Sequence, residues 1–310
     1  MKTAFLFPGQ GSQYTGMGRE LATKFDAAGQ AFSSADQALG FSISRLCFEG
    51  PEEALKLTEN TQPAILTTSI ACFRALESNG VTPDFVAGHS LGEYSALVAA
   101  GGLTLEDAVV TVRRRGQYMQ EAVPVGAGAM AAILGLTLAA VEETCRDAAE
   151  GQVVSPANIN SPEQIVIAGN ATAVERAVNL AKGRGAKRAI LLQVSAPFHC
   201  ALMKPAQDRL ADDLWGVTFS NLRCPLVNNL GGRAITAADE ARAGLIGQVS
   251  APVLWEHSMR RLAELGATHF VEAGPGRVLC GLLRQIDRSL IAMNVEDEKS
   301  LQAALEKLKS

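Results

Sequence analysis

The segment Gly88-His89-Ser90-Leu91-Gly92 constrains the fold of this 310-residue chain more than any other feature. It fits the pattern Gly-x-Ser-x-Gly, follows the short apolar run at residues 85–87, and precedes a helical stretch that continues through Ala100. A serine on a sharp strand-to-helix turn needs small residues on both sides, because a Cβ there would clash with the backbone as it folds back. We therefore predict a nucleophile elbow at the carboxyl end of a strand. On this pattern alone, the serine could instead serve as a simple helix cap.

The rest of the chain alternates short apolar runs with amphipathic helical stretches, an order typical of a parallel sheet covered by helices. Further strands are predicted at residues 3–7, 225–228, 269–272 and 290–293. Helices are predicted at residues 63–79, 105–122 and 296–310, the last with Leu301, Leu305 and Leu308 on one face. The sequence therefore indicates an α/β fold.

The pattern of predicted strands and helices changes at about residue 126, where Pro124, Gly126 and Gly128 indicate a flexible connection. Four strands and two helices are predicted beyond it, in the order β-α-β-β-α-β, at residues 129–134, 138–149, 153–158, 164–168, 172–184 and 188–194. This order is that of the ferredoxin-like motif. We predict a large doubly wound, hydrolase-like parallel-sheet domain from residues 1–125 and 198–310, with a small ferredoxin-like subdomain inserted at residues 126–197.

Composition excludes several classes of protein. A hydrophobic content of 47% with 19% charged residues supplies a packed core and excludes a disordered chain. The net charge is -4, so the chain lacks the excess of basic residues that is typical of a nucleic-acid-binding protein. No apolar run approaches the roughly 18 residues of a membrane span, and the apolar run near the start is too short for a secretory signal. We expect a cytoplasmic protein that binds neither nucleic acid nor membrane.

The six cysteines and four histidines suggest no metal site. The cysteines contain no C-x-x-C pair, and the histidines form no ligand-spaced cluster with them. We expect buried free thiols.

A serine nucleophile needs a base, and four histidines are candidates. His89 is adjacent to the serine and is expected to pack beneath the elbow. His257 lies on a predicted solvated helix, and His269 begins a strand without polar company. His199 lies where the inserted segment returns to the large domain, a position that lines a cleft, so we choose His199 as the base. Judged by its position alone, a structural role for this residue is equally compatible.

A buried arginine is predicted on the helix at residues 105–122. The apolar stripe of that helix runs through Ala108, Val112, Arg115 and Met119, so Arg115 faces the core. An unpaired guanidinium is costly there, and an anionic partner is expected. This partner is either a structural carboxylate or the carboxylate of a substrate held by two hydrogen bonds.

Taken together, the motifs resemble those of the malonyl-CoA:acyl carrier protein transacylases of fatty acid synthesis, which are similar to the acyltransferase domains of polyketide synthases. The resemblance runs nearly end to end. It rests on Phe7-Pro8-Gly9-Gln10-Gly11-Ser12-Gln13, Thr61-Gln62-Pro63, the elbow with Glu93, Arg115-Gly116 with Met119-Gln120, Asn158-Ile159-Asn160-Ser161-Pro162, Ala196-Pro197-Phe198-His199 and Glu272-Ala273-Gly274-Pro275-Gly276.

The resemblance implies a role for each matching site residue. Ser90 would be the nucleophile and His199 the general base and acid. The oxyanion hole would consist of the backbone N–H groups of Gln10 and Leu91. The remaining implied roles are binding of the malonyl carboxylate by Arg115, orientation of the histidine by the backbone carbonyl of Gln248, and selection against branched acyl groups by Phe198.

The implied reaction is a ping-pong transfer. Malonyl-CoA acylates the serine, CoA leaves, and the phosphopantetheine thiol of acyl carrier protein attacks the ester. The resemblance implies a monomer with no metal or redox cofactor, and with the coenzyme A thioester and acyl carrier protein as partners. A basic cluster on the inserted segment is a candidate docking surface for the acidic carrier, although a solvated loop fits equally well; it comprises Lys182, Arg184, Lys187 and Arg188.

Two other functions remain open on the sequence. A serine esterase or thioesterase would use water in place of the thiol, but would not need Arg115, and hydrolases of this type carry an Asp motif between serine and histidine that is not evident here. A non-catalytic scaffold that kept the fold is the second alternative, against which stand the intact Ser90 and His199.

Overall fold

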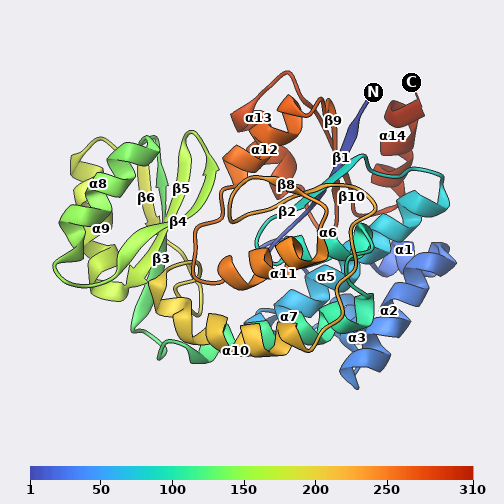
Figure 1. Cartoon of the computed structure of the whole chain (residues 1–310), viewed down its shortest axis with the longest axis horizontal. Coiled ribbons are helices and arrows are strands. Elements are labelled where there is room, and N and C mark those ends of the chain that lie inside the picture. The colour runs from blue at the N-terminus through green and yellow to red at the C-terminus, as the bar shows by residue number, and fades with distance from the viewer. Residues whose placement is uncertain (310) are drawn as a thin grey trace.

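The computed structural model describes residues 1–309, which form two sheets and the helices around them (Figure 1). The larger sheet has six strands in the order β10-β9-β1-β2-β7-β8. Their bounds are β1 (Thr3–Phe7), β2 (Phe85–Gly88), β7 (Leu226–Val227), β8 (Ala234–Ile235), β9 (His269–Ala273) and β10 (Ile291–Val295). All neighbouring strands are parallel except β7 and β8. The predicted parallel α/β sheet is therefore confirmed, and the antiparallel edge strand β8 is an addition to it.

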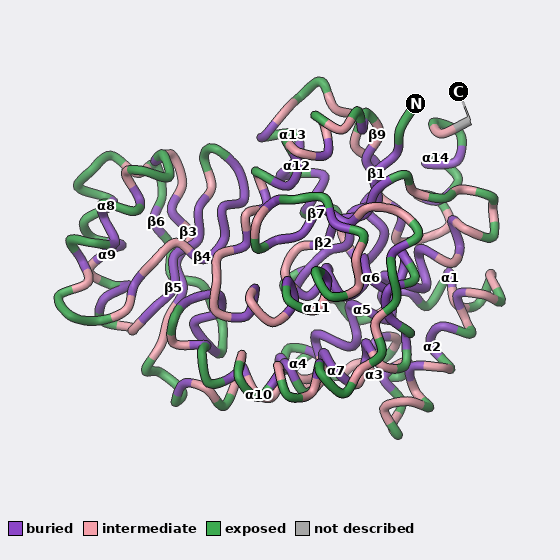
Figure 2. The backbone as a smooth tube through the Cα atoms, in the orientation of Figure 1, coloured by how far each residue is buried: buried purple, intermediate pink, exposed green. Residues whose placement is uncertain are grey.

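Helices cover both faces of this sheet, because successive residues of its strands point to opposite sides. In β1, Phe5 and Phe7 pack into the larger core cluster, whereas Ala4 and Leu6 pack into a second cluster with Trp255. Figure 2 shows the buried backbone concentrated at these central strands and exposure at the outer helices. The sheet is thus doubly wound, as predicted.

The helices of this region are more numerous than the sequence pattern indicated, and the helix predicted at residues 63–79 begins five residues earlier, at Thr58. They are α1 (Arg19–Lys24), α2 (Asp26–Leu39), α3 (Ile43–Glu49), α4 (Glu52–Leu55), α5 (Thr58–Ser78), α6 (Gly92–Ala99), α7 (Leu105–Glu121), the 3-10 helix η1 (Ala201–Met203), α10 (Lys204–Trp215), α11 (Ala238–Gly247), α12 (Trp255–Glu264), α13 (Val278–Ile286) and α14 (Glu298–Lys309).

The C-terminal helix keeps the expected stripe on the core side. Leu301 and Leu305 are buried and Leu308 packs against the same cluster. The prediction extended this helix to Ser310, which lies outside the described residues.

The smaller sheet has four strands in the order β4-β5-β3-β6, and all their pairings are antiparallel. Its elements follow the predicted order: β3 (Gly128–Leu134), α8 (Leu138–Ala149), β4 (Val154–Ser161), β5 (Gln164–Asn170), α9 (Ala171–Gly183) and β6 (Arg188–Leu191). The strand β6 ends three residues earlier than predicted: the N–H of Leu192 still donates to Met130 of β3, but that of Val194 donates locally to the carbonyl of Leu192. That residues 126–197 are a subdomain in their own right stays a prediction.

In residues 1–309, no helix has the length and apolarity needed to cross a bilayer. The six cysteines are free thiols, five of them buried and Cys224 half-buried.

Candidate active site

The nucleophile elbow has the predicted strand-to-helix context. Ser90 lies between the end of β2 and the start of α6, with φ at 52°. A Cβ on Gly88 would lie 1.9 Å from the backbone carbon of Gly92, and one on Gly92 would lie 2.0 Å from the carbonyl oxygen of Phe7. These contacts are with backbone atoms, so only glycine fits at both positions. The turn holds Ser90 at the carboxyl edge of the parallel sheet, where such folds bind ligands.

His199 meets the serine in space although 109 residues separate them. Its Nε2 lies 2.6 Å from Ser90 Oγ, and its Nδ1 lies 2.8 Å from the backbone carbonyl oxygen of Gln248. A carbonyl only accepts, so Nδ1 carries the proton and Nε2 is left to accept from the serine. This is the arrangement of a serine and its base, with a carbonyl where many triads have a carboxylate.

The imidazole of His199 is held neutral by its surroundings. Burial, and next the positive charge of Arg115, lower the pKa of His199 to about 3, although the hydrogen bond to Gln248 opposes this shift. The base is therefore unprotonated, and ready to take a proton, throughout the range in which enzymes of this kind work.

Arg115 is buried in the same site, with 1% of its surface exposed. Its Nη1 donates to Gln62 Oε1 at 2.8 Å, and its Nη2 donates to Gln248 Oε1 at 2.9 Å and to Ser90 Oγ at 3.1 Å. Its Nε has no acceptor, and no carboxylate of the described residues lies within ion-pair distance of the guanidinium. Of the two partners that the sequence left open, a structural carboxylate paired with Arg115 is therefore not found in residues 1–309. A buried cation with a free donor suits an anionic ligand.

The two backbone N–H groups expected at an oxyanion hole both lie at the cavity beside the serine. Gln10 follows the carboxyl end of β1 and Leu91 follows Ser90, so adjacent strands bring them to one edge of the sheet. Neither N–H donates to an acceptor within residues 1–309, whereas the N–H of Ser90 donates to Asn229 Oδ1 at 2.7 Å. These two are thus the donors free to bind a developing negative charge.

A cavity of about 760 Å³ opens above these groups. Its floor is the elbow, and its walls include Met130 and Val166 of the smaller sheet and Leu279 of α13. Phe198, the expected selectivity residue, also lines this cavity. The volume is that of a site for a small-molecule ligand or cofactor-sized group.

The other histidines differ partly from expectation. His89 was expected to pack beneath the elbow; its ring packs against Trp255, with centroids 5.3 Å apart, the residue also borders the cavity, and its Nε2 lies 2.8 Å from Asn160 Oδ1. The Asn160 side chain on the smaller sheet turns the ring in that direction. His257 is exposed on α12, as predicted. His269 was expected to have no polar neighbour, but its Nδ1 lies 2.9 Å from Thr268 Oγ1.

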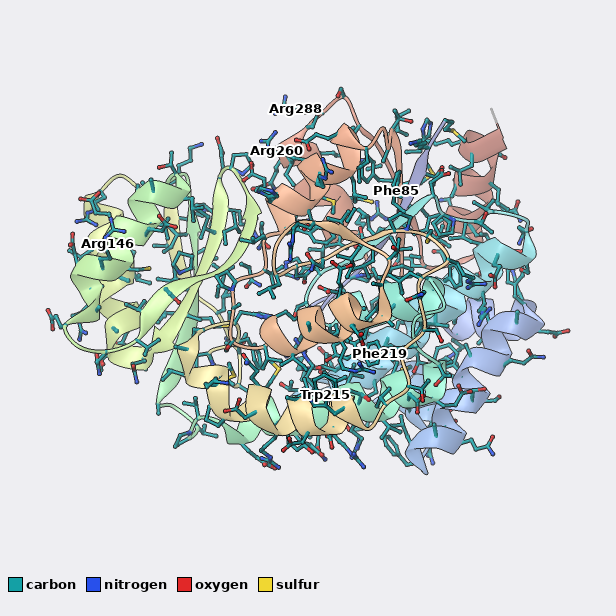
Figure 3. The ribbon with its side chains drawn as sticks, in the orientation of Figure 1. Phe85, Arg146, Trp215, Phe219, Arg260 and Arg288 are labelled. Atoms are coloured by element: carbon teal, nitrogen blue, oxygen red, sulfur yellow. The ribbon has the colours of Figure 1, made fainter. Side chains whose placement is uncertain are left out.

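The basic cluster expected on the cleft side (Lys182, Arg184, Lys187 and Arg188) does not line the cavity. Arg184 pairs with Asp147 of α8, and Lys187 with Glu163 at 3.1 Å. Figure 1 shows α8 and α9 on the side of the smaller sheet away from the larger one, and Figure 3 shows Arg146 of α8 at that outer end. The intramolecular carboxylates thus offset part of the charge that a docking surface would need.

Two contributors to the site carry no role in the sequence motifs. Gln62 of α5 binds Arg115, and the Asn229 side chain binds the N–H of Ser90 and, at 2.7 Å, the carbonyl of Gly88. Asn229 follows the short strand β7 at the carboxyl edge of the sheet. A polar residue directly after an apolar strand is the only signal of it in the sequence.

Comparison with known proteins places this geometry in a family. The sequence model of the acyl transferase domain matches residues 4–303. A malonyl CoA-acyl carrier protein transacylase of Bacillus subtilis is 50% identical over 309 residues, which are 99% of this chain and 98% of the relative. The chain belongs to the malonyl CoA-acyl carrier protein transacylase family.

Solved structures of this transacylase family agree over the whole length. The transacylase of Coxiella burnetii is 45% identical, with a TM-score of 0.98, covering 100% of this chain and 98% of the other. A malonyl-transacylase solved in complex with a type II PKS acyl-carrier protein is 47% identical, with a TM-score of 0.97 over 99% and 100% of the two chains. The transacylase fold therefore includes both the larger and the smaller sheet of this chain, and the family resemblance of the sequence is confirmed.

Proposed function

We propose that this chain transfers the malonyl group of malonyl-CoA to the phosphopantetheine thiol of acyl carrier protein, through a malonyl ester of Ser90. The observation that carries the proposal is Arg115, a buried guanidinium with a free donor and no carboxylate partner in residues 1–309, 3.1 Å from the Ser90 oxygen. A plain esterase has no use for a cation at this place. An acyl group that ends in a carboxylate requires one.

The short distance between Arg115 and Ser90 selects the length of the acyl group. In a malonyl group one methylene separates the carboxylate from the carbonyl that the serine attacks. The carboxylate of an acyl-serine must therefore lie close to Ser90 Oγ, which is where the guanidinium lies. The ring of Phe198, which lines the same cavity, would crowd a methyl branch on that methylene. Both features favour malonyl over longer or α-branched groups.

In the first half-reaction Ser90 Oγ gives its proton to His199 Nε2 and attacks the thioester carbonyl carbon. The N–H groups of Gln10 and Leu91 bind the negative charge that develops on the carbonyl oxygen. The C–S bond then breaks, and the sulfur of CoA leaves with the proton from His199. The backbone carbonyl of Gln248 keeps the imidazole in the required tautomer.

In the second half-reaction the same groups act in reverse. The carrier thiol gives its proton to His199 and its sulfur attacks the ester carbonyl, bound again by the two N–H groups. The C–O bond of the ester breaks, and Ser90 Oγ recovers the proton. Each proton has a donor and an acceptor among these residues, so the proposed reaction needs no metal or redox cofactor.

The proposal includes the cellular role. The enzyme supplies malonyl extender units for fatty acid biosynthesis, acts in the cytoplasm as a monomer, and has the coenzyme A thioester and acyl carrier protein as its partners. Neither nucleic acid nor a membrane takes part.

The test is a loading experiment without carrier protein. Purified enzyme is mixed with malonyl-CoA or acetyl-CoA and weighed intact by mass spectrometry, beside Ser90→Ala and Arg115→Ala. We expect a malonyl adduct that Ser90→Ala abolishes, and Arg115→Ala should lose malonyl but not acetyl loading. Release of free malonate without an adduct would indicate a hydrolase, and the absence of both would indicate a scaffold.

A further inference from the structure

Glu93 is a fully buried carboxylate in the first turn of α6, three residues after the nucleophile. No cation of the described residues lies within ion-pair distance of it. Its Oε2 accepts two hydrogen bonds, from Gln248 Nε2 at 2.8 Å and from the backbone N–H of Asn229 at 2.9 Å, whereas its Oε1 has no partner. A buried acid with no ion pair is costly, and the reaction as described above does not use it.

The first of these bonds is the shorter of two that set which way the Gln248 amide faces, the other being from the same Nε2 to the backbone carbonyl oxygen of Ser90 at 3.3 Å. Its Nε2 donates to Glu93, so its Oε1 is turned to Arg115 Nη2 at 2.9 Å. With the amide reversed, an NH₂ group would face the guanidinium, and two donors would meet. A carboxylate oxygen that bears no proton can only accept, so Glu93, as the nearer of the two acceptors, holds Gln248 in the orientation in which it binds the arginine.

The second bond, from the Asn229 N–H to Glu93, connects the carboxylate to the nucleophile through Asn229. Glu93 holds the backbone of Asn229, whose side chain spans the elbow from the carbonyl of Gly88 to the N–H of Ser90. Ser90 has a positive φ of 52°, a conformation that a non-glycine residue keeps only when its surroundings hold it. The carboxylate therefore supports both the serine and the arginine through one neighbour each.

We propose that Glu93 is a positioning residue, which through Gln248 and Asn229 sets Arg115 and Ser90 at the separation that a malonyl group requires. This inference rests on the proposed malonyl transfer and adds the residue that determines its geometry. Glu93 does not contact the base. His199 binds the backbone carbonyl of Gln248, whereas Glu93 binds its side chain, so the orientation of the histidine does not depend on the orientation of the Gln248 amide. Loss of Glu93 should therefore impair malonyl recognition more than proton transfer.

The test compares Glu93→Leu and Glu93→Gln with wild type, using single-turnover loading from malonyl-CoA and from acetyl-CoA. Glutamine can place its one oxygen where Oε2 accepts both bonds, and its nitrogen where Oε1 has no partner. We expect Glu93→Gln to load both donors within about threefold of wild type, because the acceptor is kept. Glu93→Leu should lower malonyl loading about tenfold or more relative to acetyl loading, because small displacements of a binding group cost that much.

Glu272→Leu is the matched control. Glu272 is also a fully buried carboxylate that accepts two hydrogen bonds, from the N–H groups of Leu279 and Cys280, but it has no contact with Arg115 or Gln248. This variant should lower the melting temperature and leave the ratio of malonyl to acetyl loading unchanged. Thermal melts of all variants ensure that rates are compared per folded molecule. If Glu93→Leu does not fold, Glu93→Asp, which shortens the reach, takes its place with the same expectation.

An unchanged donor ratio in Glu93→Leu would overturn the proposal, and so would a Glu93→Gln variant as impaired as Glu93→Leu. The pathway is checked in an Arg115→Ala background, where the Glu93 substitution should not alter the donor ratio further, since both act on one interaction. An additive effect would refute action through Arg115. Wild type that loads no malonyl would refute the proposed function itself, so the two failures are distinguishable.

Discussion

Replacing Arg115 by methionine isolates the role of its charge. Methionine keeps an unbranched apolar stem of similar length in the helix α7, so the packing around the site should change little. What disappears is the guanidinium fork next to Ser90. We expect malonyl loading to fall steeply and acetyl loading to change by only a few-fold.

The size of the effect follows from the hydrogen bonds that the fork can offer. A hydrogen bond to a charged group contributes about 1.5 to 3 kcal/mol, and a guanidinium gives a carboxylate two of them. The expected loss is about 3 to 6 kcal/mol, or about 10² to 10⁴ in kcat/KM for malonyl-CoA. Stability should change little, because the loss of a buried charge offsets the two amide oxygens, of Gln62 and Gln248, that are left without a donor.

The assay is single-turnover acylation, measured with both thioesters at matched concentrations and followed by intact mass. Arg115→Lys serves as the companion variant, because it keeps the charge but not the two-pronged geometry, and should lie between wild type and methionine. An equal fall for malonyl and acetyl donors in Arg115→Met would refute the assignment of this residue to the substrate carboxylate. It would leave Arg115 as a structural support of the serine.

Three further predictions concern the elbow and the titrating groups. Gly92→Ala should destabilise the protein by about 2 to 4 kcal/mol in a denaturant melt and abolish loading, because the new Cβ meets the Phe7 carbonyl. Because the pKa of His199 is about 3, the rate of acetyl loading should change less than about threefold from about pH 8 to about pH 5, whereas with a histidine of ordinary pKa it would fall about thirtyfold. The measurement uses the Glu93→Gln variant, which lacks the titratable carboxyl group of Glu93 beside the site. Burial raises the pKa of Glu272 to about 7, so the folded state keeps a proton that the unfolded state releases, and stability falls as the pH rises from about 4.5 to about 7; Glu272→Gln should remove part of that fall in melts across this range.

The elbow and the buried arginine could be predicted because both are written in short stretches of sequence. Gly88 and Gly92 flank the serine within one turn, and the apolar spacing of α7 places Arg115 on the buried face. Such patterns depend on local geometry, on the backbone of a turn or the period of a helix, and not on what the rest of the chain does.

The contacts that hold the site together could not be predicted in this way. Asn229 reaches Ser90 because β7 lies next to β2, and neighbours in a sheet cannot be read from their strands. The orientation of His89 likewise depends on Asn160, from the smaller sheet. Short helices such as α3 and α4 lack the length over which a helical period becomes visible.

The use of a backbone carbonyl to orient His199, in place of an acid, is consistent with a substrate that carries its own carboxylate. An aspartate at this point would lie close to Arg115 in a site of low dielectric constant, where opposite charges attract strongly. It would compete with the substrate for the guanidinium and repel the malonyl carboxylate. Gln248 avoids both effects, since its carbonyl orients the base and its amide oxygen holds the arginine without neutralising it. The acid of the site, Glu93, binds the amide of Gln248 and not the guanidinium. It can therefore fix the orientation of Gln248 and leave the positive charge of Arg115 free to bind the substrate carboxylate.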